Sequence, residues 1–204
     1  MSNMVDSPQQ YFKELSPARD ELLLELEAEA GRENIPIVGP VVGELLFILA
    51  GAVKAQNILE IGTATGYSAI YLARGCKPVN GRVITLERDS SRAASARQNF
   101  EKAGLEKRIE VRQGDALKTL SGMDDEFDLI FIDIEKKDYA SALPDCGRLL
   151  RAGGLLLADN VGFKDADGFN RMISNHPDWR AVSLFCYLPL HSPENDALCI
   201  ALRL

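Results

Sequence analysis

Residues 57–68 constrain the fold of this chain more strongly than any other stretch of its sequence. They read NILEIGTATGYS: an apolar run with an acidic residue, a loop between two glycines, and the start of a helix. Gly62 and Gly66 permit a tight turn and the close approach of a ligand, because glycine lacks a Cβ atom. Molecules of the nucleotide type bind beside such a loop, at the helix N-terminus. The stretch therefore predicts the first unit of an open α/β sheet with a ligand at its edge.

Apolar runs alternate with helical segments along the rest of the chain. Runs of this kind are typical of a parallel sheet that is covered by helices on both faces. Residues 179–188 and 197–204 form two last runs without a long helical segment between them, so we expect an antiparallel hairpin at the sheet edge. The prediction is an α/β fold with a seven-stranded, mostly parallel sheet and an antiparallel C-terminal strand. The expected parallel strands are 58–62, 82–87, 108–112, 127–133 and 154–160.

The segment before the first strand, residues 1–56, reads as a helical addition to the sheet core of residues 57–204. Residues 1–17 indicate a loose arm or a short helix. A helical pattern follows until Gly31 ends it, and residues 41–53 predict a second, largely buried helix. We expect a single domain, because 204 residues suit one core. The N-terminal helices would cover a site or form a contact between subunits.

Charge and composition exclude several classes of function. Lys and Arg number 23 against 30 Asp and Glu, so the formal net charge is -7 and gives no overall attraction for nucleic acid. The four cysteines form no C-x-x-C pair and no secretory leader is present, which predicts reduced thiols in a cytoplasmic protein. The longest apolar region, residues 35–53, is broken by two prolines and a glutamate, so we expect no membrane span.

Acidic residues recur at or near the carboxyl ends of the predicted strands. That edge of an open α/β sheet is where ligands bind. One acid there would be explained by a helix cap or a turn, but several on one edge favour a ligand site. These acids are Glu60, Glu87, Asp115, Asp133 and Asp159.

Glu87 and the glycine loop together indicate the class of ligand. A carboxylate at the end of the second strand can bind both ribose hydroxyls of a nucleoside. The competing interpretation of Glu87 is a cap for the helix that begins near Ser90. The loop has the pattern G-x-x-x-G, which is neither the G-x-G-x-x-G of dinucleotide sites nor a phosphate loop followed by G-K-[ST]. It suits a nucleoside without a phosphate, such as S-adenosylmethionine.

A second set of polar residues follows the fourth and fifth strands. Asp133, Asp159 and Asn160 supply three oxygen ligands at adjacent strand ends, which suits Mg²⁺ or a similar divalent cation. Lys136 is close enough in sequence to reach the same cavity, where a lysine with a lowered pKa can act as a base. The competing interpretation is that Lys136 and Lys137 form a solvated pair at a helix start.

Three motifs carry a resemblance to a known family. EIGTATGYS at 60–68, FIDIEKKDY at 131–139 and DNV at 159–161 resemble the cation-dependent O-methyltransferases, which include the catechol and caffeoyl-CoA O-methyltransferases and many bacterial relatives. The resemblance covers the chain from about residue 35 to its end. It implies a Rossmann-like fold and methyl transfer from S-adenosylmethionine to a hydroxyl of a small phenolic or catechol-like acceptor. It also implies a homodimer.

The resemblance further implies a role for each matching residue. Lys136 would be the general base, and the cation would be held by Asp133, Asp159 and Asn160. Glu87 would hold the ribose, and Asp115 would lie by the adenine. The implied S-adenosylmethionine contacts are Glu60, Gly62, Thr63, Gly66, Tyr67, Ser68, Glu87, Arg88, Asp115, Ala116 and Asp133.

The sequence departs from the family pattern near the expected acceptor. Ile134 and Glu135 replace the usual small residue and Asp, the segment after Asn160 is short, and residues 191–196 replace a glycine-rich turn. The first two departures leave the identity of the acceptor open. Some bacterial relatives methylate a hydroxylated wobble uridine in tRNA, and the N-terminal half and residues 175–178 are similar to that subgroup. A non-catalytic module that binds S-adenosylmethionine is a second alternative. We expect His191 to be an exposed turn residue.

Overall fold

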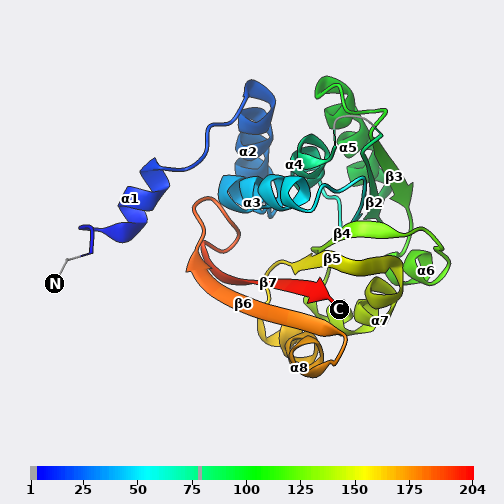
Figure 1. The fold of residues 1–204 in the computed structure, drawn as a ribbon. Helices are drawn as coiled ribbons and strands as arrows, with labels where there is room; N and C mark the ends of the chain where they lie inside the picture. Colours follow the sequence, from blue (N-terminus) through cyan, green and yellow to red (C-terminus); the bar gives the residue numbers. More distant parts are fainter. Residues whose placement is uncertain (1–3, 78–79) are drawn as a thin grey trace.

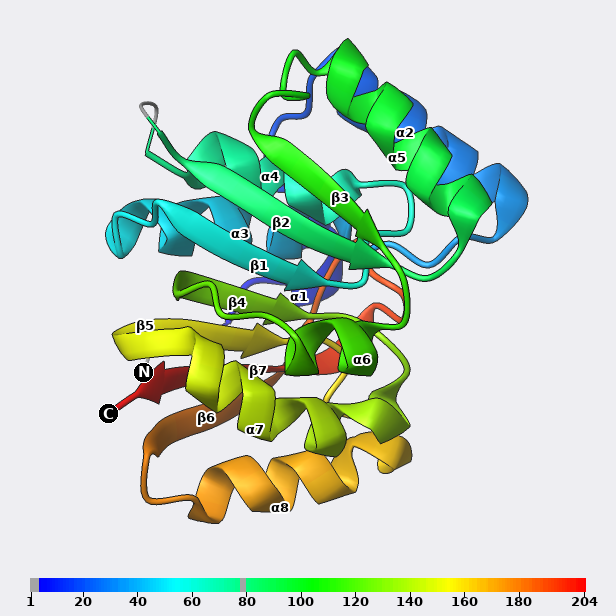
Figure 2. The same ribbon diagram turned by 90° about the vertical axis from the view of Figure 1, so that its right-hand side faces the viewer.

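The computed structural model describes residues 4–77 and 80–204, so the first three residues of the predicted N-terminal arm lie outside the described residues. Within these ranges the chain forms a seven-stranded sheet with the order β3-β2-β1-β4-β5-β7-β6 (Figures 1 and 2). This confirms the predicted fold class. The strands are β1 Asn57–Ile61, β2 Arg82–Glu87, β3 Ile109–Gln113, β4 Phe127–Ile132, β5 Leu150–Ala158, β6 Trp179–Tyr187 and β7 Asn195–Arg203.

Parallel and antiparallel pairing occupy separate parts of the sheet. β1 to β5 pair in parallel, as in the registers Ile58↔Val83 and Ile58↔Leu129, whereas β7 runs antiparallel to both β5 and β6. β1 and β4 are buried along nearly their whole length because both sheet faces are covered there. The predicted C-terminal hairpin is confirmed, and it forms the sheet edge.

Helices cover the two faces of the sheet as separate groups. The side chains of α2 to α5 contribute to one apolar core, and those of α6 to α8 contribute to a second core on the opposite face (Figure 2). Both faces of the sheet are therefore buried under helices. These helices are α2 Glu21–Glu33, α3 Gly39–Ala52, α4 Tyr67–Gly75, α5 Ser90–Lys102, α6 Ala116–Ser121, α7 Tyr139–Leu149 and α8 Asp167–Asn175, with two short 3₁₀ turns at Lys136–Asp138 and Lys164–Ala166.

The N-terminal segment differs from its prediction at one point. α1, Pro8–Glu14, is a short helix that buries none of its residues and stands apart from the sheet (Figure 1). The prediction ended this helix at Gly31, but α2 continues to Glu33. Asn34 follows with a φ of 54° and ends the helix in the left-handed conformation. Gly31 lies within the helix, has no left-handed φ, and has nothing within 4 Å of the position that a Cβ would occupy.

Two aromatic residues of the hairpin differ in burial. Trp179 is buried, whereas Phe185 is 75% exposed and does not belong to the core. Both lie on the edge strand β6, whose outward face is uncovered along most of its length. No helix in the described part of the chain is long and apolar enough to cross a membrane.

The strand order places a binding site at a defined point. The chain moves outward from β1 to β3 in one direction and from β4 to the hairpin in the other, so the order reverses between β1 and β4. Ligands of open α/β sheets bind outside the carboxyl ends of the strands at such a reversal. The arrowheads of β1, β2 and β4 point to that edge in Figure 2.

Candidate active site

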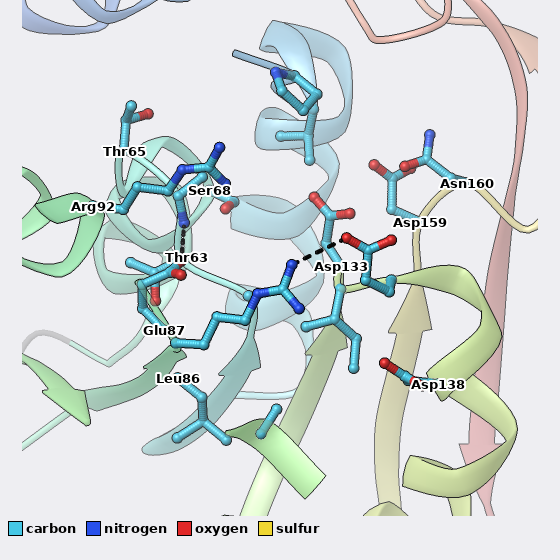
Figure 3. A pocket seen from close by; sticks show the side chains of 18 of the residues that line it. Thr63, Thr65, Ser68, Leu86, Glu87, Arg92, Asp133, Asp138, Asp159 and Asn160 are labelled. Carbon is cyan, nitrogen blue, oxygen red and sulfur yellow. Dashed lines mark hydrogen bonds and ion pairs between the residues drawn. The ribbon is translucent and has the colours of Figure 1, made fainter. Parts of the chain in front are cut away.

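A cavity of about 350 Å³ lies at this edge of the sheet. Its walls come from the loops after β1, β2, β3, β4 and β5, together with the connector between α2 and α3. Figure 3 shows Thr63, Ser68 and Glu87 on one side of the cavity and Asp159 and Asn160 on the other, with Asp133 between them. The predicted site residues that line the cavity are Gly62, Thr63, Tyr67, Ser68, Glu87, Arg88, Asp115, Ala116, Asp133, Lys136, Asp159 and Asn160.

The glycine loop takes a conformation that requires glycine. Gly62 has a φ of 107° and Gly66 a φ of 86°, both in the left-handed region that other residues rarely adopt. A Cβ on Gly62 would collide with the backbone carbonyl of Asp133, and one on Gly66 would enter the ring of Phe100. Gly66 itself does not line the cavity. Gly66 allows the loop to pack against Phe100, and Gly62 allows the backbone at the end of β4 to approach the loop.

Glu60 lies beneath the loop and is fully buried. Its Oε2 accepts a hydrogen bond from the hydroxyl of Thr85 at 2.6 Å, and the Thr85 hydroxyl is 2.5 Å from that of Thr63. Burial raises the pKa of Glu60 to about 8. Its second oxygen, Oε1, has no hydrogen-bond partner in the described structure. Glu60 is therefore placed one layer behind the cavity wall and supports the loop through two threonines.

Glu87 ends β2 and lines the cavity. One carboxylate oxygen accepts from the backbone N–H of Ala64 at 2.9 Å, and the other accepts from that of Asp89 at 2.9 Å. Glu87 thus ties the loop after β1 to the end of β2. It does not cap the following helix, because the Asp89 side chain accepts the N–H groups of Ser91 and Arg92. The capping interpretation of Glu87 is therefore wrong.

Asp115 has a structural contact as well as a place in the cavity wall. Its side chain caps α6 by accepting the N–H of Lys118 at 3.0 Å. Arg88, also at the cavity, is largely exposed and pairs with Glu135 at 3.3 Å. Both residues lie at the mouth of the cavity rather than in its floor.

Asp133 and Lys136 form an ion pair at the end of β4. The Lys136 Nζ lies 3.1 Å from Asp133 Oδ1, and about a quarter of each side chain is exposed. Burial raises the pKa of Asp133, and the nearby charge of Asp159 raises it further. Lys137, in contrast, is exposed. The two lysines therefore do not form the solvated pair that was the competing prediction.

Asp159 and Asn160 follow β5 and are both buried. The Asn160 Nδ2 donates to the Asp196 carboxylate at 2.6 Å and to the carbonyl of Ser192 at 3.1 Å. Both oxygens of Asp159 lie 2.9 Å from the Nε2 atom of His191. The prediction that His191 is exposed is wrong, because its side chain is fully buried against Asp159.

Several residues of the site carried no signal in the sequence that identified them. Pro36, Ile37 and Val38, in the connector between α2 and α3, line the cavity beside the glycine loop. The Tyr67 hydroxyl donates to Glu27 of α2 at 2.7 Å, which fastens the N-terminal helices to the loop. The N-terminal segment therefore covers part of the site, one of its two predicted roles.

Comparison with known proteins gives consistent matches. A family model described as O-methyltransferase matches residues 13–167. A catechol O-methyltransferase from Niastella koreensis is 41% identical over 169 residues, which cover 79% of this chain and 76% of that protein. An O-methyltransferase from Bacillus cereus, solved in complex with SAH, has a TM-score of 0.85 at 32% identity and covers 97% of both chains. The O-methyltransferase TomG from Streptomyces achromogenes, which is involved in tomaymycin synthesis and was solved with SAM, has a TM-score of 0.86 at 30% identity over 97% of this chain and 96% of that one.

Proposed function

This chain belongs to the O-methyltransferase family and is an S-adenosylmethionine-dependent O-methyltransferase, and from that premise we propose that it methylates a hydroxyl of a small phenolic, catechol-like acceptor with the help of a divalent cation. The observation that carries the proposal is the grouping of Asp133, Asp159 and Asn160 with Lys136 in the cavity that the glycine loop borders. The glycine loop and these four residues thus line the same cavity.

The glycine-loop side of the cavity suits the methyl donor. We propose that Glu87 accepts the ribose hydroxyls, since its carboxylate lines the cavity at the end of β2. The loop backbone beside Gly62 and Thr63 would receive the methionine part, and Asp115 and Ala116 the adenine. Two of the matched structures were solved with SAH and with SAM, which supports a donor of this kind.

The opposite side of the cavity suits a divalent cation. Its donors would be the carboxylates of Asp133 and Asp159 and the amide oxygen of Asn160, the hard ligands that Mg²⁺ prefers. The Asn160 nitrogen is already engaged by Ser192 and Asp196. Among the described residues no three His, Cys, Asp or Glu side chains are placed to hold a metal, so the set depends on Asn160. Burial and then the charge of Asp159 raise the pKa of Asp133, and a bound cation would offset the repulsion between the two carboxylates.

We propose that Lys136 receives the acceptor proton. When bound, the cation would lower the pKa of a hydroxyl that it touches. Neutral Lys136 would take that proton on Nζ, and the resulting oxygen anion would attack the sulfonium methyl group and release S-adenosylhomocysteine. The 3.1 Å contact with Asp133 Oδ1, which an N–H of Lys136 can make, keeps Nζ at the cation side of the cavity. Ile134 and the connector residues Ile37 and Val38 supply apolar walls for an aromatic ring.

The assembly and location also belong to this proposal. α1 exposes Tyr11 and Phe12, and β6 exposes Val182, Leu184 and Phe185. A second copy of the chain that covered these apolar surfaces would form the homodimer that we expect. The four cysteines are free, which suits the reducing cytoplasm.

One assay tests the proposal against its alternatives. The protein is incubated with labelled S-adenosylmethionine and either a panel of catechols or tRNA that carries hydroxylated wobble uridine, with Mg²⁺ or with a chelator. We expect catechol methylation that chelation abolishes. Methylation of tRNA alone would identify the alternative substrate, full activity after chelation would remove the cation, and donor binding without turnover on either substrate would favour the non-catalytic module.

A further inference from the structure

The loop between β6 and β7 reaches back over the cation side of the cavity. It contains His191, whose side chain is fully buried although the surrounding residues Ser192 and Pro193 are exposed. In the sequence this loop is the segment that replaces the glycine-rich turn of the family pattern.

Both ring nitrogens of His191 face acceptors. Nε2 lies 2.9 Å from each carboxylate oxygen of Asp159, and Nδ1 lies 2.6 Å from the backbone carbonyl of Pro193. Because a carbonyl and a carboxylate only accept, each of these contacts requires an N–H on the ring, and the Nδ1 contact fixes the plane of the ring. The ring then presents its opposite corner, Nε2, to Asp159. The ring thus contacts its own loop through Nδ1 and the Asp159 carboxylate through Nε2.

The same loop holds the neighbouring residue. Asn160 has a φ of 50°, an uncommon backbone conformation, and its amide nitrogen is fixed by Ser192 and Asp196. Asp196 in turn accepts the backbone N–H of Gly162 at 3.2 Å. Two of the three proposed cation donors are thus oriented by the β6–β7 loop and the start of β7.

We propose that His191 is a positioning residue that acts through Asp159, holding its carboxylate in the orientation that a divalent cation requires. The inference rests on the cation of the proposed function. His191 does not line the cavity. Partners that orient the ligands of a metal are typically worth about 10–100-fold in metal affinity.

Two amide variants separate the Asp159 contact from the loop contact. His191→Gln places its side-chain nitrogen near the position of Nε2 and can still donate to Asp159. His191→Asn is shorter, reaches only the Nδ1 position, and keeps the contact with Pro193 while losing Asp159. The chain has only one other histidine, the exposed His176, so His176→Gln is the matched control.

The measurement is Mn²⁺ affinity by isothermal titration calorimetry, with S-adenosylhomocysteine affinity and thermal unfolding measured on the same samples. We expect His191→Asn to bind Mn²⁺ about 10–100-fold more weakly, while His191→Gln recovers most of the affinity and His176→Gln matches the wild type. S-adenosylhomocysteine affinity should stay unchanged in all three variants.

The contrary outcomes are distinct. If the wild type does not bind Mn²⁺, the cation of the proposed function is lost, and this inference with it. If the wild type binds and His191→Asn binds equally well or more tightly, the positioning role alone is refuted. Equal losses in His191→Asn and His191→Gln, or a loss of S-adenosylhomocysteine binding, would show that His191 serves the fold instead.

Discussion

Gly62→Ala is expected to damage both the stability of the protein and its donor site. Gly62 has a φ of 107°, and a Cβ there would overlap the backbone carbonyl of Asp133. The left-handed conformation costs a residue with a side chain about 1–2 kcal/mol, and overpacking a tight site costs about 1–3 kcal/mol more. The sum, about 2–5 kcal/mol, corresponds to a fall in Tm of roughly 4–20 °C for a domain of this size.

Gly104→Ala provides the matched control for this prediction. Gly104 has a φ of 67°, but nothing lies within 4 Å of the position that its Cβ would occupy. It therefore bears only the conformational cost, about 1–2 kcal/mol. The difference between the two variants isolates the collision with Asp133.

The assay combines thermal unfolding with S-adenosylhomocysteine binding and methyl transfer. We expect Gly62→Ala to be the less stable variant and to lose donor affinity, because Asp133 must move away from the loop. Gly104→Ala should keep wild-type binding and turnover. Equal stability of the two variants, with donor binding intact in both, would refute the reasoning.

Three further predictions concern single side chains. Lys136→Ala should lower turnover by about 10²–10⁴-fold while leaving donor binding unchanged, and Lys137→Ala, at an exposed neighbour, should not; near-normal turnover of Lys136→Ala would remove the base assignment. Tyr67→Phe removes the 2.7 Å bond to Glu27 and should cost about 1.5–3 kcal/mol in urea unfolding; an unchanged midpoint would contradict it. Burial alone would raise the pKa of Asp128, but hydrogen bonds from Asn57, Arg151 and Gln56 outweigh it and lower the pKa. The ionised Asp128 therefore stabilises the folded state at pH values above the pKa that it has in the unfolded chain. This stabilisation is lost as the pH falls through the pKa of the folded state. Asp128→Asn should therefore be less stable than the wild type at neutral pH, with the gap closing below about pH 4; a gap that is constant with pH would argue against this.

Local patterns were sufficient for the sheet and for one half of the site. The apolar runs at β1 and β4 predicted buried parallel strands, because a strand that is covered on both faces has no polar side. Gly62, Glu87 and Asp133 could be assigned to one edge from the sequence, since parallel strands bring their carboxyl ends together. Asp115 and Glu87 also showed where local patterns are ambiguous: both could be caps, and only the hydrogen bonds assigned the capping role to Asp115 and Asp89.

The sequence by itself determined the fold class, the donor loop and the acids at the strand ends, because each depends on residues close together in the chain. Only the tertiary structure decided the contacts that cross it. His191 lies 32 residues from Asp159 in sequence, and it becomes buried because the hairpin folds back over the sheet edge. Phe185 becomes exposed because β6 is the last strand and nothing in the described chain covers it. Burial at an edge depends on which elements pack there, and that is a property of the assembled fold.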